Sequence, residues 1–278
     1  MELHEKANQG IINKFSIFCS ANTLMPYKYK KLVFDAAVTS ALLYSAETWM
    51  TNNYKTIERQ YNQLIRCLLG VRANTSISLC MIECGIPPVR GLIASRRCKF
   101  LKGKLQAPDV EQPFHFVHGL CGRYNTPSSK FIREALNYTE VDSISALVEN
   151  MQERVGSTKI VTYTSVLNAQ MTVHPVYSTN DYIPDYQRVA FTRLRLMSHN
   201  LRVETGRWSR TPRESRICDC DPNQIQTESH VLLNCPLTQG YRDDHCMLSF
   251  DSMETLMNTD QVCKELCKYV YTVLQHFS

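Results

Sequence analysis

Apolar side chains recur at helical spacing along most of the first hundred residues. Residues 54–69 carry one apolar stripe, which consists of Ile57, Tyr61, Leu64, Ile65 and Leu68. The opposite side is basic and carries Lys55, Arg59 and Arg66. This period predicts a helix that buries one face and exposes the other. Asn53 is a suitable residue to cap its start, and Gly70 a suitable residue to end it.

Further helices are predicted on both sides of this one. Residues 31–44 are apolar on nearly every side, which predicts a helix buried all round. A short helix over 75–84 is expected to end at Gly85. The prolines 87 and 88 then start a helix whose apolar stripe is Val89, Ile93 and Phe100. Nine consecutive residues of this helix carry Arg96, Arg97, Lys99, Lys102 and Lys104, with no acid among them.

The pattern changes after residue 106. Residues 106–127 hold three prolines, two histidines and two glycines, which predicts a connecting stretch and a domain boundary. Helices are predicted near 128–137 and 141–154, while β-branched residues over 158–177 favour one or two short strands. A helix opens at Pro184 and Asp185, and the last one covers 260–277. We therefore expect a mainly α protein in three parts: a helical domain over 1–106, a connector over 107–180 and a basic helical domain over 181–278.

Composition agrees with a folded protein. Hydrophobic residues make up 44% and charged residues 21% of the 278, which is typical of a globular chain. The net charge is only +5, so an argument for a polyanionic partner depends on where the charges lie. Residues 1–14 are polar and do not form a secretory signal, and no uncharged apolar run reaches the ~18 residues of a membrane helix. We expect a reducing compartment, cytoplasmic or nuclear, no contact with a membrane, and cysteines that are free thiols or metal ligands.

A metal-binding motif lies near the end of the chain. Cys218 and Cys220 are followed after nine residues by His230, and after four more by Cys235. Zinc prefers four sulfur or nitrogen ligands in a tetrahedron. Turn-forming residues follow Cys220, so the loop can fold back and bring all four together. Four protein ligands leave no open position, so we predict one structural zinc in a small turn of the C-terminal domain.

Other interpretations of these residues remain open. The four can be unrelated core residues in a reducing compartment, and His245 or Cys246 can replace one of the ligands. Cys263 and Cys267 are four residues apart on the last predicted helix, where we expect two packed thiols.

A basic stretch precedes the metal motif. Its arginines are Arg193, Arg195, Arg202, Arg207, Arg210, Arg213 and Arg216. Only Glu204 and Glu214 oppose them, and Trp208 lies in their midst. Arginine with an interleaved aromatic residue suits phosphate contact together with base stacking. The alternative is a solvated basic surface, or arginines that pair with acids elsewhere in the fold.

Several segments of the chain resemble one known family. Residues 34–49, with Leu42-Leu43-Tyr44-Ser45-Ala46-Glu47-Thr48-Trp49, are similar to the helix that begins the thumb of non-LTR (LINE-like) retrotransposon polymerases. Residues 65–71 resemble a segment that follows it. Residues 191–214 and 228–236 resemble the end of such polymerases and their terminal Cys/His motif. The resemblance implies a thumb-like helical bundle followed by a zinc-binding domain, with template RNA or an RNA/DNA hybrid as partner.

The resemblance covers only the C-terminal part of such a polymerase. The fingers and palm are missing from this chain, so we expect no enzymatic activity. Tyr241-Arg242-Asp243-Asp244 matches the Tyr-x-Asp-Asp string of reverse transcriptases, but its flanks are not the apolar strands that this site needs. The expected function is nucleic-acid binding, and the alternatives are a scaffold protein or a remnant without function. The residues expected to bind nucleic acid are Lys55, Arg59, Arg66, Arg96, Arg97, Arg193, Arg195, Arg207, Trp208, Arg210 and Arg213.

Overall fold

Helices dominate the computed structural model, as predicted, and the model describes residues 2–49, 54–106, 119, 127–137, 143–152, 158–258 and 263–278. Most of the predicted connecting stretch, the predicted cap Asn53 and the start of the last predicted helix lie outside these residues. The first half contains α1 (Glu2–Ala21), α2 (Tyr27–Val33), α3 (Ser40–Leu42), α4 (Lys55–Leu69), α5 (Ile77–Cys84), α6 (Val89–Gln106), α8 (Pro127–Leu136) and α9 (Ile144–Gln152).

The second half is built from shorter elements. Its helices are α10 (Thr158–Thr162), α11 (Asp185–Arg195), α12 (Arg202–Trp208), α13 (Gln239–Asp244), α14 (Met253–Met257) and α15 (Cys263–His276). The antiparallel strands β1 (Ile217–Cys218) and β2 (Asp221–Ile225) form the single sheet among the described residues.

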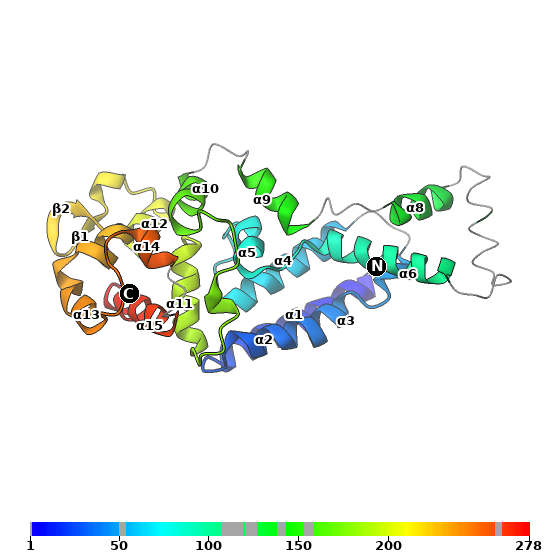
Figure 1. Cartoon of the computed structure of the whole chain (residues 1–278), viewed down its shortest axis with the longest axis horizontal. Helices are drawn as coiled ribbons and strands as arrows, with labels where there is room; N and C mark the ends of the chain where they lie inside the picture. Colours follow the sequence, from blue (N-terminus) through cyan, green and yellow to red (C-terminus); the bar gives the residue numbers. More distant parts are fainter. Residues whose placement is uncertain are drawn as a thin grey trace.

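The helices form a bundle that continues into the C-terminal part (Figure 1). α1 packs along α4 and against the helix made by α2, a π-helical turn at Phe34–Thr39, and α3. α6 packs against α4 and α8. α11 lies between this bundle and α15, which it contacts along its length (Figure 1). The hairpin and α13 lie beyond α15, so the candidate metal ligands are at the far end of the molecule from α8 (Figure 1).

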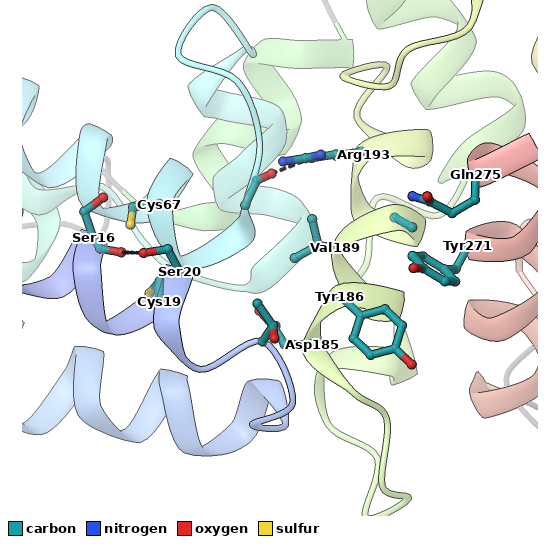
Figure 2. A pocket seen from close by; sticks show the side chains of 13 residues that line it. Ser16, Cys19, Ser20, Cys67, Asp185, Tyr186, Val189, Arg193, Tyr271 and Gln275 are labelled. Atoms are coloured by element: carbon teal, nitrogen blue, oxygen red, sulfur yellow. Dashed lines mark hydrogen bonds between the residues drawn. The ribbon is translucent and has the colours of Figure 1, made fainter. Parts of the chain in front are cut away.

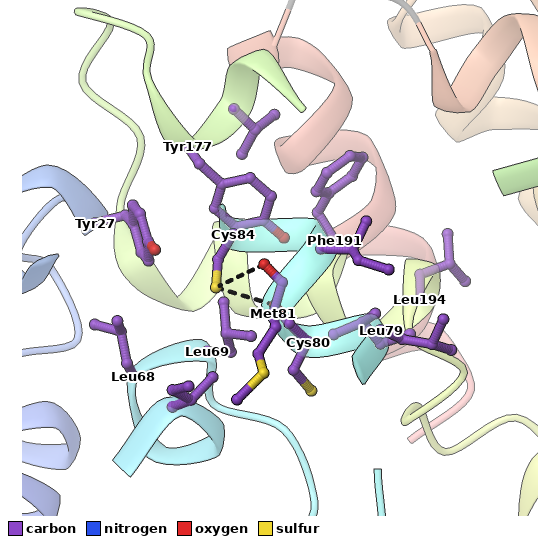
Figure 3. Packing of buried hydrophobic residues seen from close by; sticks show 14 of the residues in the cluster. Tyr27, Leu68, Leu69, Leu79, Cys80, Met81, Cys84, Tyr177, Phe191 and Leu194 are labelled. Atoms are coloured by element: carbon purple, nitrogen blue, oxygen red, sulfur yellow. Dashed lines mark hydrogen bonds between the residues drawn. The ribbon is translucent and has the colours of Figure 1, made fainter. Parts of the chain in front are cut away.

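One apolar core runs through both halves. Buried side chains of α2, α4 and α5 meet those of α11, including Tyr27, Leu68, Cys84 and Phe191 (Figure 3). The same cluster continues to Val270 of α15, which is fully buried. The three-part division stays a prediction, and the packing joins the residues of its first and third parts.

The α4 helix confirms the predicted stripe and its predicted end. All five stripe residues are buried, and Lys55 and Arg59 are exposed on the other side. Gly70 ends the helix with φ of +69°, a left-handed conformation that suits glycine. A Cβ on Gly70 would lie 2.7 Å from Cγ2 of Val189 on α11.

Gly70→Ala is therefore expected to destabilise the protein by about 2–4 kcal/mol, since a left-handed alanine and a forced core contact each cost about 1–2 kcal/mol. Urea unfolding measures this cost. Gly10→Ala is the matched control, because Gly10 lies in α1 with open space around its Cα and should gain about 0.5–1 kcal/mol. Equal effects of the two substitutions would contradict the argument.

Three predicted features are wrong in detail. The helix over residues 31–44 is not buried all round, because it lies at the edge of the bundle and leaves Leu32 63% and Tyr44 76% exposed. Phe100 is 38% exposed and does not complete the stripe of α6. Residues 158–167 are helical and not extended, because Tyr163 and Leu167 pack into the core, where tertiary contacts override the weak β preference of the segment.

No single described helix is long and apolar enough to span a membrane, while α5 and α6 meet that criterion only as a pair bent by 57°.

Candidate metal centre and basic surface

The first two candidate ligands lie on the β hairpin. Cys218 ends β1, and Cys220 is the last residue of the two-residue turn before β2. The pairing is irregular between Ile217 and Cys218, which bends the hairpin at the first ligand. Cys218 is buried and Cys220 is half-buried, so the pair lies at the boundary between core and solvent.

The other two ligands are the ends of a π-helical turn. His230 begins the turn His230–Asn234, and Cys235 follows it. The Cys235 amide donates to the His230 carbonyl at 2.7 Å, which brings the two residues together. The turn packs on α15, where the hydroxyl of Tyr269 donates to the Leu232 carbonyl at 2.5 Å. The predicted short helix or turn is confirmed.

The four ligand atoms converge on one point. Sγ of Cys218, Cys220 and Cys235 and a ring nitrogen of His230 all lie within 4.8 Å of one another. The Cys218 and Cys235 sulfurs are 3.8 Å apart, and the Cys220 sulfur is 3.1 Å from His230 Nε2. A tetrahedral zinc with Zn–S bonds of about 2.3 Å separates two sulfurs by about 3.8 Å. The Cys3His cluster could therefore hold one metal ion such as zinc.

The protonation of the cluster without metal agrees with this chemistry. Burial, together with hydrogen bonds that the Cys220 thiol donates to Cys218 and Cys235, raises its pKa to about 12. Burial also raises the pKa of Cys235 and lowers that of His230, which Arg242 lowers further. The imidazole is thus ready to ligate as the neutral ring, while metal binding has to displace thiol protons.

The alternative ligands lie outside the cluster. Cys246 is exposed, and Nδ1 of the buried His245 lies 2.8 Å from the Tyr241 carbonyl. Cys263 and Cys267 are buried on α15, as predicted for packed thiols. Among the described residues, the Cys3His cluster is the one group of His, Cys, Asp or Glu side chains that could hold a metal ion.

Two arginines hold the backbone around the cluster. Arg202 of α12 donates to the Ile217 carbonyl and to Asp219, both at 2.7 Å, and so fixes the hairpin from outside. The buried Arg242 donates to the Cys235 carbonyl at 2.8 Å and to the Thr238 hydroxyl at 2.7 Å. The sequence does not indicate the role of Arg242, because its contact with the Cys235 carbonyl depends on how residues 235–242 fold.

Two of the predicted nucleic-acid contacts lie in the interior. Arg195 is fully buried and pairs with Glu83, whose Oε1 is 2.6 Å from Arg195 Nε. Arg97 is buried and contacts the ring of Phe131 and the carbonyl of Ala46. Neither side chain is part of the exposed basic surface, because each guanidinium is used inside the fold.

Other predicted contacts are partly occupied by internal partners. Arg66, Arg96 and Arg193 each donate to a backbone carbonyl, those of Thr75, Leu43 and Gly70 respectively. Arg207 pairs with the buried Glu204 at 2.9 Å. The alternative of arginines paired with groups elsewhere in the fold thus holds for part of the stretch.

The remaining predicted residues are exposed. Lys55, Arg59, Trp208, Arg210 and Arg213 all belong to this set. In the described part of the chain, no side-chain hydrogen bond or ion pair is found for Arg210 and Arg213, although the Arg213 carbonyl accepts from the Arg216 amide at 3.1 Å. The indole of Trp208 is 44% exposed, and its ring lies 3.6 Å from the guanidinium of Arg72, measured to the centroid.

The loop over residues 70–76, which follows α4, contacts the basic stretch 193–216. Its Arg72 amide donates to the Ser198 hydroxyl at 3.0 Å, and Arg193 donates to the Gly70 carbonyl at 2.7 Å. Lys55 is 11 residues before Arg66 on α4, which places it about 16 Å away along the helix axis. Arg72 is missing from the sequence-based set, because nothing in the local pattern pairs it with Trp208.

Asp243 and Asp244 lie on the short helix α13 and not on a hairpin between strands. Both are exposed, and Gln239 donates to Asp243 at 2.7 Å within the same helix. The matching string therefore has the wrong local structure for a pair of metal-binding aspartates at a polymerase centre.

Comparisons with protein-family models, with curated proteins and with solved structures give no significant match. The structure shows a mainly α fold with a Cys3His cluster that could hold a metal ion.

Proposed function

We propose that this chain is a non-catalytic nucleic-acid-binding module, the C-terminal part of a retrotransposon reverse transcriptase, in which one structural zinc holds the end of the fold. Its partner would be template RNA or an RNA/DNA hybrid. The resemblance of four segments to such polymerases motivates the class of protein. The surface around Trp208 carries the argument for binding.

Trp208 presents one ring face to the guanidinium of Arg72 and leaves the indole partly exposed. Arg72, Lys159 and Trp208 line a pocket of about 180 Å³. Base stacking on an aromatic face and phosphate contact with cationic side chains are the two terms of single-strand binding. The fixed indole can stack a base without first losing side-chain freedom.

The basic side chains around this pocket supply the charge. Arg210 and Arg213 follow Trp208 directly and are exposed. Lys159 and Arg207 share the single buried carboxylate of Glu204, so this trio keeps a net positive charge. The proposed binding surface around Trp208 does not include Arg97 or Arg195.

The Cys3His cluster would also stabilise the surface around Trp208. Arg202 joins the hairpin to α12, the helix that ends at Trp208. Bound zinc would fix the hairpin and so the position of α12. Its role would be structural, because all four positions of a tetrahedron are filled by protein.

Binding of single-stranded RNA is expected to depend steeply on salt. With about three to five phosphate contacts and a slope of about 0.7 per contact, a rise from 50 to 200 mM salt weakens binding about 20- to 130-fold. Removing Arg210 and Arg213 together should lower the slope by about one to two. Trp208→Ala should weaken binding about 5- to 150-fold with little change in slope, because stacking is not ionic. Fluorescence anisotropy at three salt concentrations measures all of these values.

The matched control removes two other exposed charges. Lys264→Ala/Lys268→Ala on α15 makes the same change in net charge far from Trp208 in the sequence. The opposite outcome is a wild type that binds weakly, with a shallow dependence of affinity on salt. If this variant, the arginine variant and Trp208→Ala then give the same result, nucleic-acid binding is excluded.

A second candidate function is a protein scaffold. The observation in its favour is the set of exposed apolar side chains on α1, the helix of α2 and α3, and the loops that flank it, namely Ile17, Leu24, Tyr29, Leu32 and Tyr44. If these side chains form a contiguous patch, they are suited to bind a protein partner. The salt titration distinguishes the two functions, because a scaffold has no salt-sensitive affinity centred on Trp208.

A further inference from the structure

Two cysteines from different helices face each other at the wall of a pocket. Cys19 lies on α1 and Cys67 on α4, and both line a pocket of about 480 Å³ that also borders α11 and α15 (Figure 2). The two side chains are close enough that each thiol shifts the pKa of the other. Both side chains are half-buried, whereas Cys80, Cys84 and Cys98 are buried in the bundle.

Charged and polar groups surround this pair. The buried ammonium of Lys30, from α2, donates to the Cys19 carbonyl at 2.7 Å and to Asp185 of α11 at 2.6 Å. Ser16, one turn before Cys19 on α1, lies at the same end of the pocket (Figure 2). A cation and a hydroxyl beside a thiol both favour its ionised form, while Asp185 opposes it.

The two thiols share their protons unequally. Hydrogen bonding from Cys19, together with Ser16 and Lys30, lowers the pKa of Cys67 to about 7 against the effect of burial. The same hydrogen bond, with burial, raises the pKa of Cys19. The pair titrates as one unit, in which Cys67 is the group that ionises first.

We propose that Cys19 and Cys67 form a peroxide-sensitive dithiol, in which Cys67 is the reacting thiolate and Cys19 the resolving thiol. The Cys67 sulfur attacks one oxygen of hydrogen peroxide and the O–O bond breaks. The proton that Cys67 released on ionising returns to the leaving hydroxide to give water, and Cys67 becomes a sulfenic acid. The Cys19 sulfur then attacks the Cys67 sulfur, the S–O bond breaks, and the leaving hydroxide takes the Cys19 proton to give a second water. In sum, two thiols lose two electrons and two protons to peroxide and form one disulfide.

The disulfide would join α1 covalently to α4. The two cysteines lie on packed helices, and their sulfurs have to approach each other to the S–S distance of about 2.05 Å. The bond closes the chain between residues 19 and 67, which lie on the two sides of the α1–α4 packing. The metal ligands are elsewhere in the fold, so the reaction at Cys67 does not depend on the cluster.

Peroxide treatment of the intact, metal-loaded protein tests the proposal. Peptide mapping without reductant should give a Cys19–Cys67 linked peptide with a mass two hydrogens below that of the two free peptides. In Cys19→Ser the sulfenic acid of Cys67 should persist and react with dimedone. In Cys67→Ser, Cys19 should give neither product. Iodoacetamide at pH 7 should label Cys67 at least several-fold faster than the exposed Cys246.

The outcomes separate this dithiol from ordinary oxidation. Cys246→Ser serves as the control and should leave the linked peptide unchanged. If Cys67 reacts no faster than Cys246, or if Cys67 links only to other cysteines, the proposal is overturned. Should Cys19→Ser fail to fold, wild-type peptide mapping and the labelling rates decide the question without it.

Discussion

Cys235→Ser is expected to remove the bound metal and to loosen residues 200–245, while the wild-type protein carries about one zinc per chain. The serine hydroxyl is a poor zinc ligand, and three remaining ligands do not close the tetrahedron. Cys235 is the most informative ligand to replace, because its side chain is fully buried and its carbonyl is held by Arg242. Metal analysis and hydrogen exchange measure the two effects.

The expected effect is large because so little else holds the hairpin. β2 exposes Pro222, Asn223 and Gln224, and β1 contributes two residues to the sheet. Structural zinc in small domains binds with about 10–16 kcal/mol of apparent free energy, and this energy is also folding energy. In contrast, the turn at His230–Asn234 packs Val231 and Leu232 into the core and should keep part of its structure. Protection should therefore fall most over residues 217–227.

His230→Ala should act in the same way, and Cys246→Ser should not. Cys246 is exposed and outside the cluster, so its substitution controls for the loss of a thiol near the C-terminus. A purified protein without zinc, with residues 200–245 equally protected in Cys235→Ser, would exclude the structural metal.

Local signals explain what could be predicted from the sequence. The four ligands lie within residues 218–235, so spacing and turn-forming residues are sufficient to indicate their convergence. The ends of α4 and α5 are likewise local, because Gly70 and Gly85 adopt the left-handed conformation that ends a helix. The stripe of α4 depends only on a period of 3.6 residues.

Long-range partners explain what could not be predicted. Arg195 and Arg97 look like surface cations, because their partners Glu83 and Phe131 lie on other elements. The stack of Arg72 on Trp208 joins residues that the chain separates by almost half its length. Likewise, the burial of Tyr163 and Leu167 depends on distant elements, α14 and Glu83 of α5 among them. Neither the composition nor the period of the apolar residues predicts these contacts.

The ion pair between Glu83 and Arg195 is the centre of a buried polar network. Arg195 donates to both oxygens of Glu83 and to the Met257 carbonyl at 2.8 Å. The hydroxyls of Tyr163 and Tyr177 donate to the same carboxylate at 2.6 and 3.1 Å. Both charged side chains are fully buried. The network thus joins α5 to α11 and to the end of α14.

Glu83→Gln is expected to destabilise the protein by about 3–5 kcal/mol, because it leaves the Arg195 guanidinium buried without a counter-ion. Tyr163 and Tyr177 donate to different oxygens of Glu83, so glutamine keeps an acceptor for only one of them, and the loss combines the missing charge with one lost hydrogen bond. Glu83→Gln/Arg195→Met removes both charges and should lose much less than the sum of the two single variants. Urea unfolding at pH 7 measures each value. Lys130→Met is the control, since it breaks the exposed pair with Glu134 and should have little effect.

The effect of Glu83→Gln should also depend on pH. Burial alone would raise the pKa of Glu83, but the charge of Arg195 and hydrogen bonds from Arg195 and Tyr163 lower it below the ordinary value. A carboxylate with a lowered pKa stabilises the fold above its unfolded pKa of about 4.3, and this contribution disappears as the pH falls through the folded pKa. The wild-type protein should therefore lose its advantage over Glu83→Gln as the pH falls below about 4. An unfolding difference that stays constant between pH 7 and pH 3 would show that Glu83 contributes through packing and not through its charge.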